Sequence, residues 1–239
     1  MKFTLLIISL NEIESSRIII PQIDKSLFHE ILVIDGGSTD GTIEFMKENN
    51  FKVIVQNQIK IPWYNFAKKQ TKIASGVLQG VEASTGDVLI LFTPDGNMIP
   101  QKLKDLIDTS KKGYDLVCVS RYKDGAKSMD DNIVSGFGNF FFTFLVNTLF
   151  KGNFTDVLGG YKAVKKELWT KVNSKSKILV SFGTQISIAC AKNNLKYTEI
   201  PGDEPKRLGG KSSTSMIING CIELFTILKA FIFKNEYKF

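Results

Sequence analysis

Short apolar runs alternate with polar helical stretches through the first hundred residues. Four apolar runs rich in β-branched residues lie at 4–10, 30–36, 51–56 and 87–93. They lack the polar alternation of a half-exposed strand, as strands covered on both faces of a parallel sheet do. Helical spacing of apolar residues is found at 11–28, 40–50 and 66–85. This order predicts an α/β fold with a mostly parallel central sheet and helices on both faces.

The second half of the chain is less regular. We expect a buried strand at 114–122, an aromatic-rich helical segment at 133–150, a short strand within 155–169, a helix at 182–193, a strand at 195–200 and a charged loop at 201–213. An apolar stretch follows at 216–233. The pattern predicts one domain over 1–213 and an apolar, amphipathic C-terminal helix within 214–239.

The apolar stretch 216–233 is interrupted by Asn219, Glu223 and Lys229. We therefore expect no uncharged run of the roughly 18 to 20 residues that span a bilayer. On a helical projection these polar positions cover about a third of the circle, which leaves a wide apolar arc. That arc suits either a peripheral membrane contact or a protein contact such as a homo-oligomer. The segment 133–150 is either core or a membrane-facing helix.

Overall charge indicates which classes of partner the protein binds, and cysteine usage indicates its cellular compartment. A net charge of +7 and a pI near 9.2 favour anionic partners such as nucleotide phosphates or acidic lipid headgroups. The lysines are scattered, so we expect no nucleic-acid partner. Three widely separated cysteines argue against a disulfide framework and a cysteine metal site. We expect a cytoplasmic protein, peripheral on the inner face of the membrane.

Polar clusters follow three of the predicted strands. They are Asn11-Glu12, Asp35 to Ser38 and Pro94 to Asn97. In open α/β sheets, ligands bind beyond the carboxyl ends of the strands, so these clusters predict a site at one sheet edge. Capping is the simpler alternative for one loop, since Ser38 or Asp40 would cap the next helix whatever the function. Asp95 is likewise either a turn residue after Pro94 or part of a metal site.

Six stretches in order carry a resemblance to a known family. They are "SLNE" (9–12), "VIDGGSTDGT" (33–42), "GVEASTGDVLILFTPDGNMIP" (80–100), "YDLVCVSRY" (114–122), "TDVLGGYKAVKKELW" (155–169) and "PKRLGGKSS" (205–213). Together the chain resembles the inverting glycosyltransferases of family 2, which have the GT-A fold, and especially their polyprenyl-phosphate sugar transferase branch. The resemblance runs from about residue 3 to residue 212.

The resemblance implies a UDP- or GDP-sugar donor. Donor-binding positions carried over from its motifs are Asn11, Glu12, Asp35, Gly37, Ser38, Asp95, Arg207 and Lys211. It also implies a divalent cation, Mg²⁺ or Mn²⁺, held by Asp95 with Asn97 as an additional oxygen ligand. Two usual aspartates are replaced by Gly36 and Thr93. One carboxylate can still suffice, because these ions often take most ligands from water and phosphate.

The same motifs imply catalytic and acceptor-binding residues. Asp156 would act as a base or orient the acceptor, and Arg121 would clamp a phosphate. Gln185, Gly160 and Tyr161 would contact the acceptor, a lipid phosphate or a cell-envelope glycan. An acceptor hydroxyl needs a general base, whereas an ionised phosphate needs cationic clamps instead.

Two rival functions stay open from the sequence. The replaced aspartates fit a degenerate nucleotide-sugar binding protein without catalysis. A nucleotidyltransferase would also use an α/β sheet, but such enzymes usually carry an N-terminal glycine-rich phosphate loop, and residues 8–17 contain no glycine.

Overall fold

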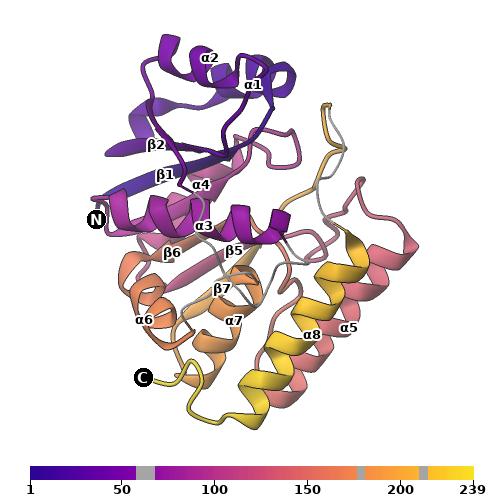
Figure 1. The fold of residues 1–239 in the computed structure, drawn as a ribbon. Helices are drawn as coiled ribbons and strands as arrows, with labels where there is room; N and C mark the ends of the chain where they lie inside the picture. Colours follow the sequence, from indigo (N-terminus) through magenta and orange to yellow (C-terminus); the bar gives the residue numbers. More distant parts are fainter. Residues whose placement is uncertain (58–67, 177–180, 210–214) are drawn as a thin grey trace.

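A seven-stranded sheet forms the centre of the protein. The computed structural model describes residues 1–57, 68–176, 181–209 and 215–239. The strands are β1 (Phe3–Ser9), β2 (Glu30–Asp35), β3 (Lys52–Val55), β4 (Val88–Phe92), β5 (Leu116–Ser120), β6 (Lys162–Lys165) and β7 (Tyr197–Pro201). Their spatial order is β3-β2-β1-β4-β6-β5-β7. Every pairing is parallel except those of β6, which runs antiparallel to β4 and β5. The predicted α/β architecture is therefore confirmed (Figure 1).

Helices cover both faces of this sheet. They are α1 (Ile13–Ile19), α2 (Thr42–Glu48), α3 (Lys68–Ala83), α4 (Lys102–Ser110), α5 (Ile133–Phe150), α6 (Lys166–Ser176), α7 (Phe182–Lys192) and α8 (Met216–Ile232). Side chains of α1, α2 and α4 pack on one face, and those of α3, α5, α6, α7 and α8 contribute to the core on the other. The predicted helix 11–28 divides into α1 and two short 3₁₀ turns, the first of which contains Pro21.

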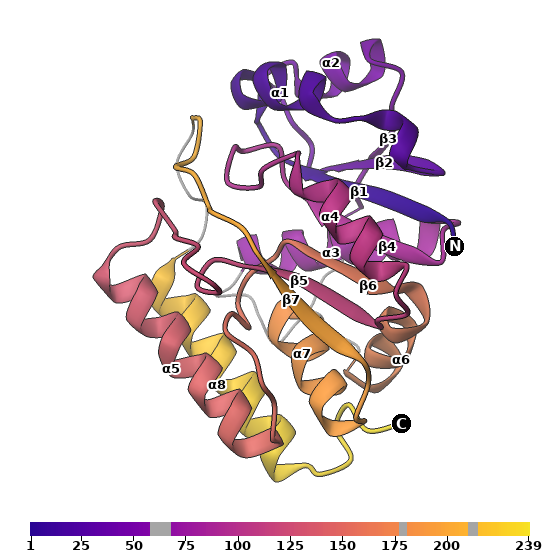
Figure 2. The ribbon, with the colours of Figure 1, turned by 180° about the vertical axis from the view of Figure 1, so that it is seen from behind.

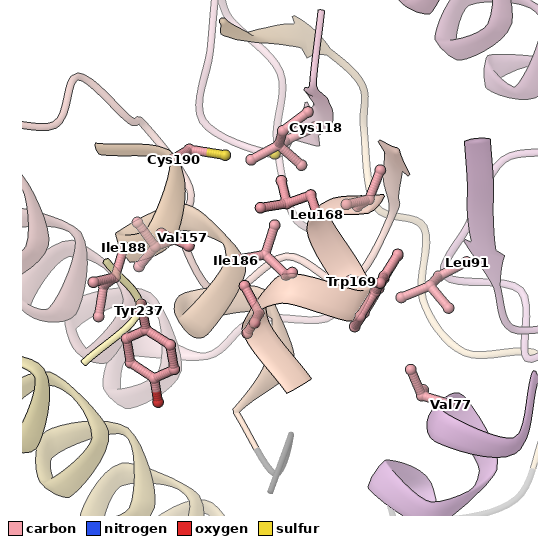
Figure 3. Packing of buried hydrophobic residues seen from close by; sticks show 14 of the residues in the cluster. Val77, Leu91, Cys118, Val157, Leu168, Trp169, Ile186, Ile188, Cys190 and Tyr237 are labelled. Atoms are coloured by element: carbon pink, nitrogen blue, oxygen red, sulfur yellow. The ribbon is translucent and has the colours of Figure 1, made fainter. Parts of the chain in front are cut away.

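The core beneath α6 and α7 contains the largest fully buried side chain among the described residues. Trp169 of α6 is fully buried and lies with Leu91 of β4 and Val77 of α3 (Figure 3). Tyr237, near the end of the chain, is also buried and lies beside Ile188 of α7. The last residues of the chain thus close the core around α7.

Helices α5 and α8 lie side by side and run in the same direction (Figures 1 and 2). Each carries a stripe of exposed apolar side chains, and together these stripes are called the apolar face. Its members are Ile133, Val134, Phe137, Phe140, Phe141, Phe144, Met216, Ile217, Leu224, Phe225, Leu228, Phe231 and Ile232. Exposure reaches 91% at Ile133 and 80% at Ile217, so the described chain leaves this face without a cover.

Helix α5 is also long and apolar enough to cross a membrane, judged by length and composition alone. It has 18 residues, a mean hydropathy of 1.5 and 22% of its residues buried within the protein. The expectation that no uncharged stretch reaches this length is therefore wrong. The polar positions of 133–150 are Ser, Asn, Thr and Gly residues, which interrupt the hydrophobic pattern without adding a charge.

Glu223 points from α8 toward the start of α7. One of its carboxyl oxygens is buried. Burial raises the pKa of Glu223 to about 7, although hydrogen bonding to Thr184 and Ser181 opposes the rise. Glu223, one of the charged residues that interrupt the apolar stretch 216–233, thus faces the protein interior. The outer side of α8 is left apolar.

Candidate functional site

The loop after β2 is organised by a buried carboxylate. Asp35 accepts hydrogen bonds from Ser9 Oγ at 2.9 Å and from the Ser38 backbone and hydroxyl at 2.6 and 2.7 Å. The Gly37 backbone N–H donates to it at 2.9 Å. Gly37 has a φ of +88°, a conformation that favours glycine. Asp35 therefore fixes the backbone of this loop, and its contact with a nucleoside stays a prediction.

Asn11 joins the loop after β1 to the loop after β2. Its backbone N–H donates to Ser38 Oγ at 2.8 Å, and its side-chain oxygen accepts from the Thr39 backbone at 2.9 Å. Asp40 accepts from the backbone N–H of Thr42, the first residue of α2, at 3.0 Å. The N-cap of α2 is Gly41, which makes no side-chain cap bond, and the Asp40 contact belongs to the turn just before it. Ser38 instead belongs to the cluster that the sequence placed at this edge.

Gly36 stands where the family pattern has a second aspartate. A Cβ at this position would lie 3.1 Å from Leu10 Cδ1 and 3.3 Å from Leu10 Cβ. A side chain at residue 36 would therefore require Leu10 to move. The close packing of Leu10 against Gly36 is therefore a steric reason for glycine instead of aspartate at this position.

Glu12 and Asp95 meet across a single guanidinium group. Arg207 donates from NH1 to Glu12 Oε1 at 2.7 Å and from NH2 to Asp95 Oδ2 at 2.7 Å. The other oxygen of Asp95 accepts from Thr93 Oγ1 and from the Asn97 backbone. The Asp95 side chain is only 8% exposed. Burial raises the pKa of Glu12, Arg207 offsets part of the rise, and the nearby charge of Asp95 adds to it.

The segment 204–209 crosses over the end of β4 and brings Arg207 to this pair. The Leu208 backbone donates to the Asp95 carbonyl at 2.9 Å, and Asn97 Nδ2 donates to the Pro205 carbonyl at 2.8 Å. Gly96 has a φ of +94°, and a Cβ there would lie 2.6 Å from Leu208 Cγ. Only glycine at residue 96 lets Leu208 sit so close. Lys211 lies outside the described residues.

The carboxylate pair fits a divalent cation that is shared with a ligand. Within the described residues, no group of three His, Cys, Asp or Glu side chains could hold a metal ion alone. Glu12 and Asp95 supply two carboxylates, and Asn97 keeps its side-chain oxygen because only its nitrogen bonds Pro205. Mg²⁺ is commonly held by one or two carboxylates together with substrate phosphates. The described side chains are therefore compatible with a cation that arrives with a diphosphate.

A second cluster surrounds Arg121 at the end of β5. Its guanidinium makes two bonds to Asp156, Nε to Oδ2 at 2.6 Å and NH2 to Oδ1 at 2.9 Å. NH1 donates to Glu204 Oε2 at 3.2 Å, and Asp131 lies 3.9 Å away. Burial lowers the pKa of Arg121, but the surrounding carboxylates outweigh it and leave the pKa raised. Arg121 is thus neutralised by acids of its own chain.

Asp156 is fully buried in this cluster. Burial raises the pKa of its carboxyl, but the hydrogen bonds and charge of Arg121 outweigh burial and hold the pKa below its usual range. Its Oδ1 also accepts from the Gly159 backbone at 2.9 Å. In this conformation Asp156 positions Arg121 and the loop of residues 156–159, and does not present a free oxygen to an acceptor.

Two acids of this cluster were not identified from the sequence. Glu199 of β7 accepts from the Thr155 backbone and hydroxyl at 2.7 and 2.8 Å and from the Asp156 backbone at 3.0 Å. Glu204 also accepts a hydrogen bond from the Ser128 hydroxyl. The only available signal was their place near the end of a strand and in the charged loop before Arg207.

The predicted acceptor-binding residues are separated by the structure. Gln185 is 4% exposed on α7 and donates to the Tyr237 hydroxyl at 2.9 Å, so it faces the C-terminal core. Tyr161 is 6% exposed and donates to the Ile99 carbonyl at 3.0 Å. Both side chains are part of the packed interior in this conformation, and an acceptor contact for either stays a prediction. Gly160 is partly exposed and lies between Met98 and Phe182.

Comparison with known proteins agrees, over most of the chain, with the resemblance to glycosyltransferase family 2 noted in the sequence. The profile of Glycosyl transferase family 2 matches residues 17–172. Glycosyltransferase AglJ of Haloferax volcanii is 28% identical over 196 residues, which cover 80% of this chain and 59% of that protein. A dolichol-phosphate mannosyltransferase of Pyrococcus furiosus is 30% identical over 130 residues, which cover 53% of this chain and 35% of that protein. The chain thus spans less than two thirds of the length of these curated relatives.

Solved structures share the fold at low sequence identity. Glucosyl-3-phosphoglycerate synthase from Mycobacterium tuberculosis, in complex with Mn²⁺, uridine diphosphate and phosphoglyceric acid, superposes with a TM-score of 0.66 at 17% identity. The match covers 96% of this chain and 78% of that one. The complex of the same synthase with Mn²⁺ and UDP-glucose gives a TM-score of 0.63.

Proposed function

The chain belongs to glycosyltransferase family 2, and on that premise we propose that it transfers a sugar from a nucleotide diphosphate donor to a membrane-borne acceptor, with inversion at the anomeric carbon. The observation that carries the proposal is the pair Glu12 and Asp95 at the carboxyl edge of the sheet, bridged by Arg207. Two carboxylates that converge on one cation form the kind of site that a metal-bound diphosphate requires.

We place the donor along the edge formed by the loops after β1, β2 and β4. Asn11, Asp35, Gly37 and Ser38 form a hydrogen-bonded platform for the nucleoside of a UDP- or GDP-sugar. Asp95 would hold the cation and the diphosphate, with Glu12 and Asn97 beside it. The mycobacterial synthase of the same fold is described with Mn²⁺ and UDP-glucose, which supports this arrangement.

The bound cation, Mg²⁺ or Mn²⁺, would neutralise the charge that develops on the leaving diphosphate. Arg207 has a complementary role in this proposal. Its guanidinium stabilises the carboxylate pair in this structure. With a cation bound to that pair, the guanidinium would be available to the diphosphate oxygens. Bidentate arginine contacts suit phosphate geometry.

We propose an acceptor whose attacking oxygen is already ionised, such as a lipid phosphate. Such an acceptor needs no general base. This choice is supported by Asp156, whose two oxygens are both occupied by Arg121 and which has no access to solvent. The Pyrococcus relative carries the name of a dolichol-phosphate mannosyltransferase, which is consistent with this class of acceptor. A glycan acceptor would instead need a base.

The proposed reaction takes place at the cytoplasmic face of a membrane. The apolar face on α5 and α8 supports the membrane contact, since large exposed apolar patches mark interaction sites. All three cysteines are free thiols, and Cys221 is exposed, which fits a reducing compartment.

The direct test is transfer by the purified chain from UDP- and GDP-sugars to a polyprenyl phosphate in detergent, with Mg²⁺ or Mn²⁺. Product anomers are assigned by NMR. We expect Asp95→Asn to remove most turnover while Asp108→Asn, at an aspartate on α4 whose side chain is 46% exposed, keeps it. Near wild-type turnover of Asp95→Asn at saturating cation would contradict the metal role. Donor binding without transfer to any acceptor would favour the non-catalytic alternative.

A further inference from the structure

A basic pocket lies at the C-terminal ends of α5 and α8. It has a volume of about 430 Å³ and is lined by Lys151, Lys192, Lys234 and Lys238 together with apolar residues that include Phe150 and Phe231. Both helices begin close to the strand-end loops, directly after the loop that follows Arg121 and the segment that follows Arg207. The pocket is therefore about 27 Å from that end, the length of α5 at 1.5 Å per residue.

The positive charge of this pocket is not neutralised within the described chain. Exposed side chains at Lys151, Lys234 and Lys238 have no carboxylate within salt-bridge distance among the described residues. Glu236, which acts on Lys192 in the pocket wall, pairs with Lys229 at 3.0 Å. An excess of positive charge in a concave site attracts anions.

Lys192 is fixed in the wall of the pocket. Its ammonium donates to the carbonyl oxygens of Ala230 at 2.9 Å and Glu236 at 2.7 Å, and lies 5.6 Å from the centre of the Phe150 ring. Burial lowers its pKa, Glu236 opposes that effect, and the neighbouring charge of Lys238 adds to it. One cation is thus preorganised, while the other three remain free to close on a ligand.

We propose that this pocket binds the phosphate headgroup of an anionic lipid while the apolar face rests in the adjoining bilayer. Phe231 belongs to both surfaces, so the pocket and the apolar face are continuous. An anionic phospholipid supplies a phosphate and an acyl region next to each other, which is the order of chemistry found here. The inference rests on the membrane contact of the proposed function and specifies where and how that contact is made.

Charge decides between a lipid surface and a second copy of the chain. A dimer formed through the apolar face would cover the phenylalanines but offer the lysines no anion from the matching surface, which carries the same lysine excess. The cytoplasmic leaflet offers both an apolar phase and a negative surface potential. Basic residues beside an exposed apolar helix face are characteristic of interfacial membrane contacts.

The proposed contact also orients the catalytic edge. Helices α5 and α8 lie on the side of the sheet toward which the parallel strands point, as both views show (Figures 1 and 2). A bilayer along the apolar face would therefore lie beside the loops that carry Arg121 and Arg207. A membrane-borne acceptor would reach those loops without leaving the surface.

The test measures binding of the full chain to vesicles of phosphatidylcholine, with and without phosphatidylglycerol. The pocket variant is Lys151→Gln/Lys234→Gln/Lys238→Gln. Its matched control is Lys47→Gln/Lys52→Gln/Lys112→Gln, three exposed lysines on α2, on β3 and after α4. Both variants lower the net charge of +7 by three. Each lysine near an anionic surface contributes roughly fivefold to partitioning, so we expect about a hundredfold weaker binding for the pocket variant only.

Other outcomes separate this inference from the proposed function. Equal losses of vesicle binding in both lysine variants would show that only net charge matters, and would overturn the proposed binding of a headgroup in the pocket. Absence of wild-type binding to any vesicle, or a stable dimer that Phe140→Ser/Phe225→Ser dissociates, would overturn the docking surface. Release of nucleotide diphosphate in detergent would still report the proposed transfer in each case. Loss of that release with intact vesicle binding would instead overturn only the proposed function.

Discussion

Replacing Arg207 by methionine should make the carboxylate pair respond to a divalent cation without a nucleotide. Arg207 makes two charge-assisted bonds of 2.7 Å, to Glu12 and to Asp95. Removing one partner of a buried ion pair costs about 3–5 kcal/mol. All three side chains keep some solvent access, with exposures of 24%, 16% and 8%. We therefore discount the cost to about 2–3 kcal/mol.

This cost has two measurable consequences. A loss of about 2–3 kcal/mol should lower the melting temperature by roughly 5–10 °C in a chain of this size. In the wild type, a cation must displace Arg207 from the two carboxylates and so loses this free energy. The variant has no such competitor and should bind Mn²⁺ on the order of 100-fold more tightly than the wild type. A ligand that binds only the folded state raises stability, so Mn²⁺ should restore much of the lost melting temperature.

The assay is a thermal melt over a Mn²⁺ titration into the millimolar range. Arg17→Met, an exposed arginine on α1, is the matched control and should behave like the wild type. Adding Asp95→Asn to Arg207→Met should remove the response. The reasoning is refuted if Arg207→Met is destabilised yet gains no more from Mn²⁺ than the wild type does.

Two further predictions follow from buried or strained positions. Glu223 has a pKa near 7 when folded and about 4.3 when unfolded, so the folded chain binds more protons between these values and stability falls as pH rises through that window. The free energy of unfolding of Glu223→Gln should therefore exceed that of the wild type by about 3 kcal/mol at pH above roughly 8, and by little below about pH 4. Urea unfolding at both pH extremes would measure this difference. An equal gain in stability at both pH values would contradict the pKa shift. Gly96→Ala should displace Leu208 and the segment 204–209, since a Cβ would lie 2.6 Å from Leu208 Cγ. We expect at least about tenfold lower kcat/KM, partly restored by Leu208→Ala; an unchanged kcat/KM would show that the position of this segment is not needed.

The sequence was sufficient to predict the sheet and the first half of the site. Apolar runs without alternation identify parallel strands, and the edge rule then brings Asn11, Asp35 and Asp95 together. These positions lie within or directly after strands, so the fold alone fixes where they meet. Local motifs therefore carried enough information about this part of the site.

The contacts of Arg207 and Arg121 were not predictable in the same way. Arg207 reaches Glu12 across 195 residues, by a path that depends on how the segment after β7 crosses β4. A motif shows that Arg121 and Asp156 are present but not that they neutralise each other. The burial of Tyr161 and Gln185 was unpredictable for a related reason, because a match in order along the chain does not show which way a side chain packs.

The antiparallel strand β6 sets an order on the synthesis of this protein. Strands β1 to β4 can pair with one another as soon as they leave the ribosome. Among the described strands, the next one, β5, pairs with β6 and β7 and with no other, and both are made later. Until Lys165 has been translated, β4 therefore presents an open, fully apolar edge, and such edges invite pairing with other chains. Fragments that end between Phe92 and Lys162 keep this edge open and should aggregate.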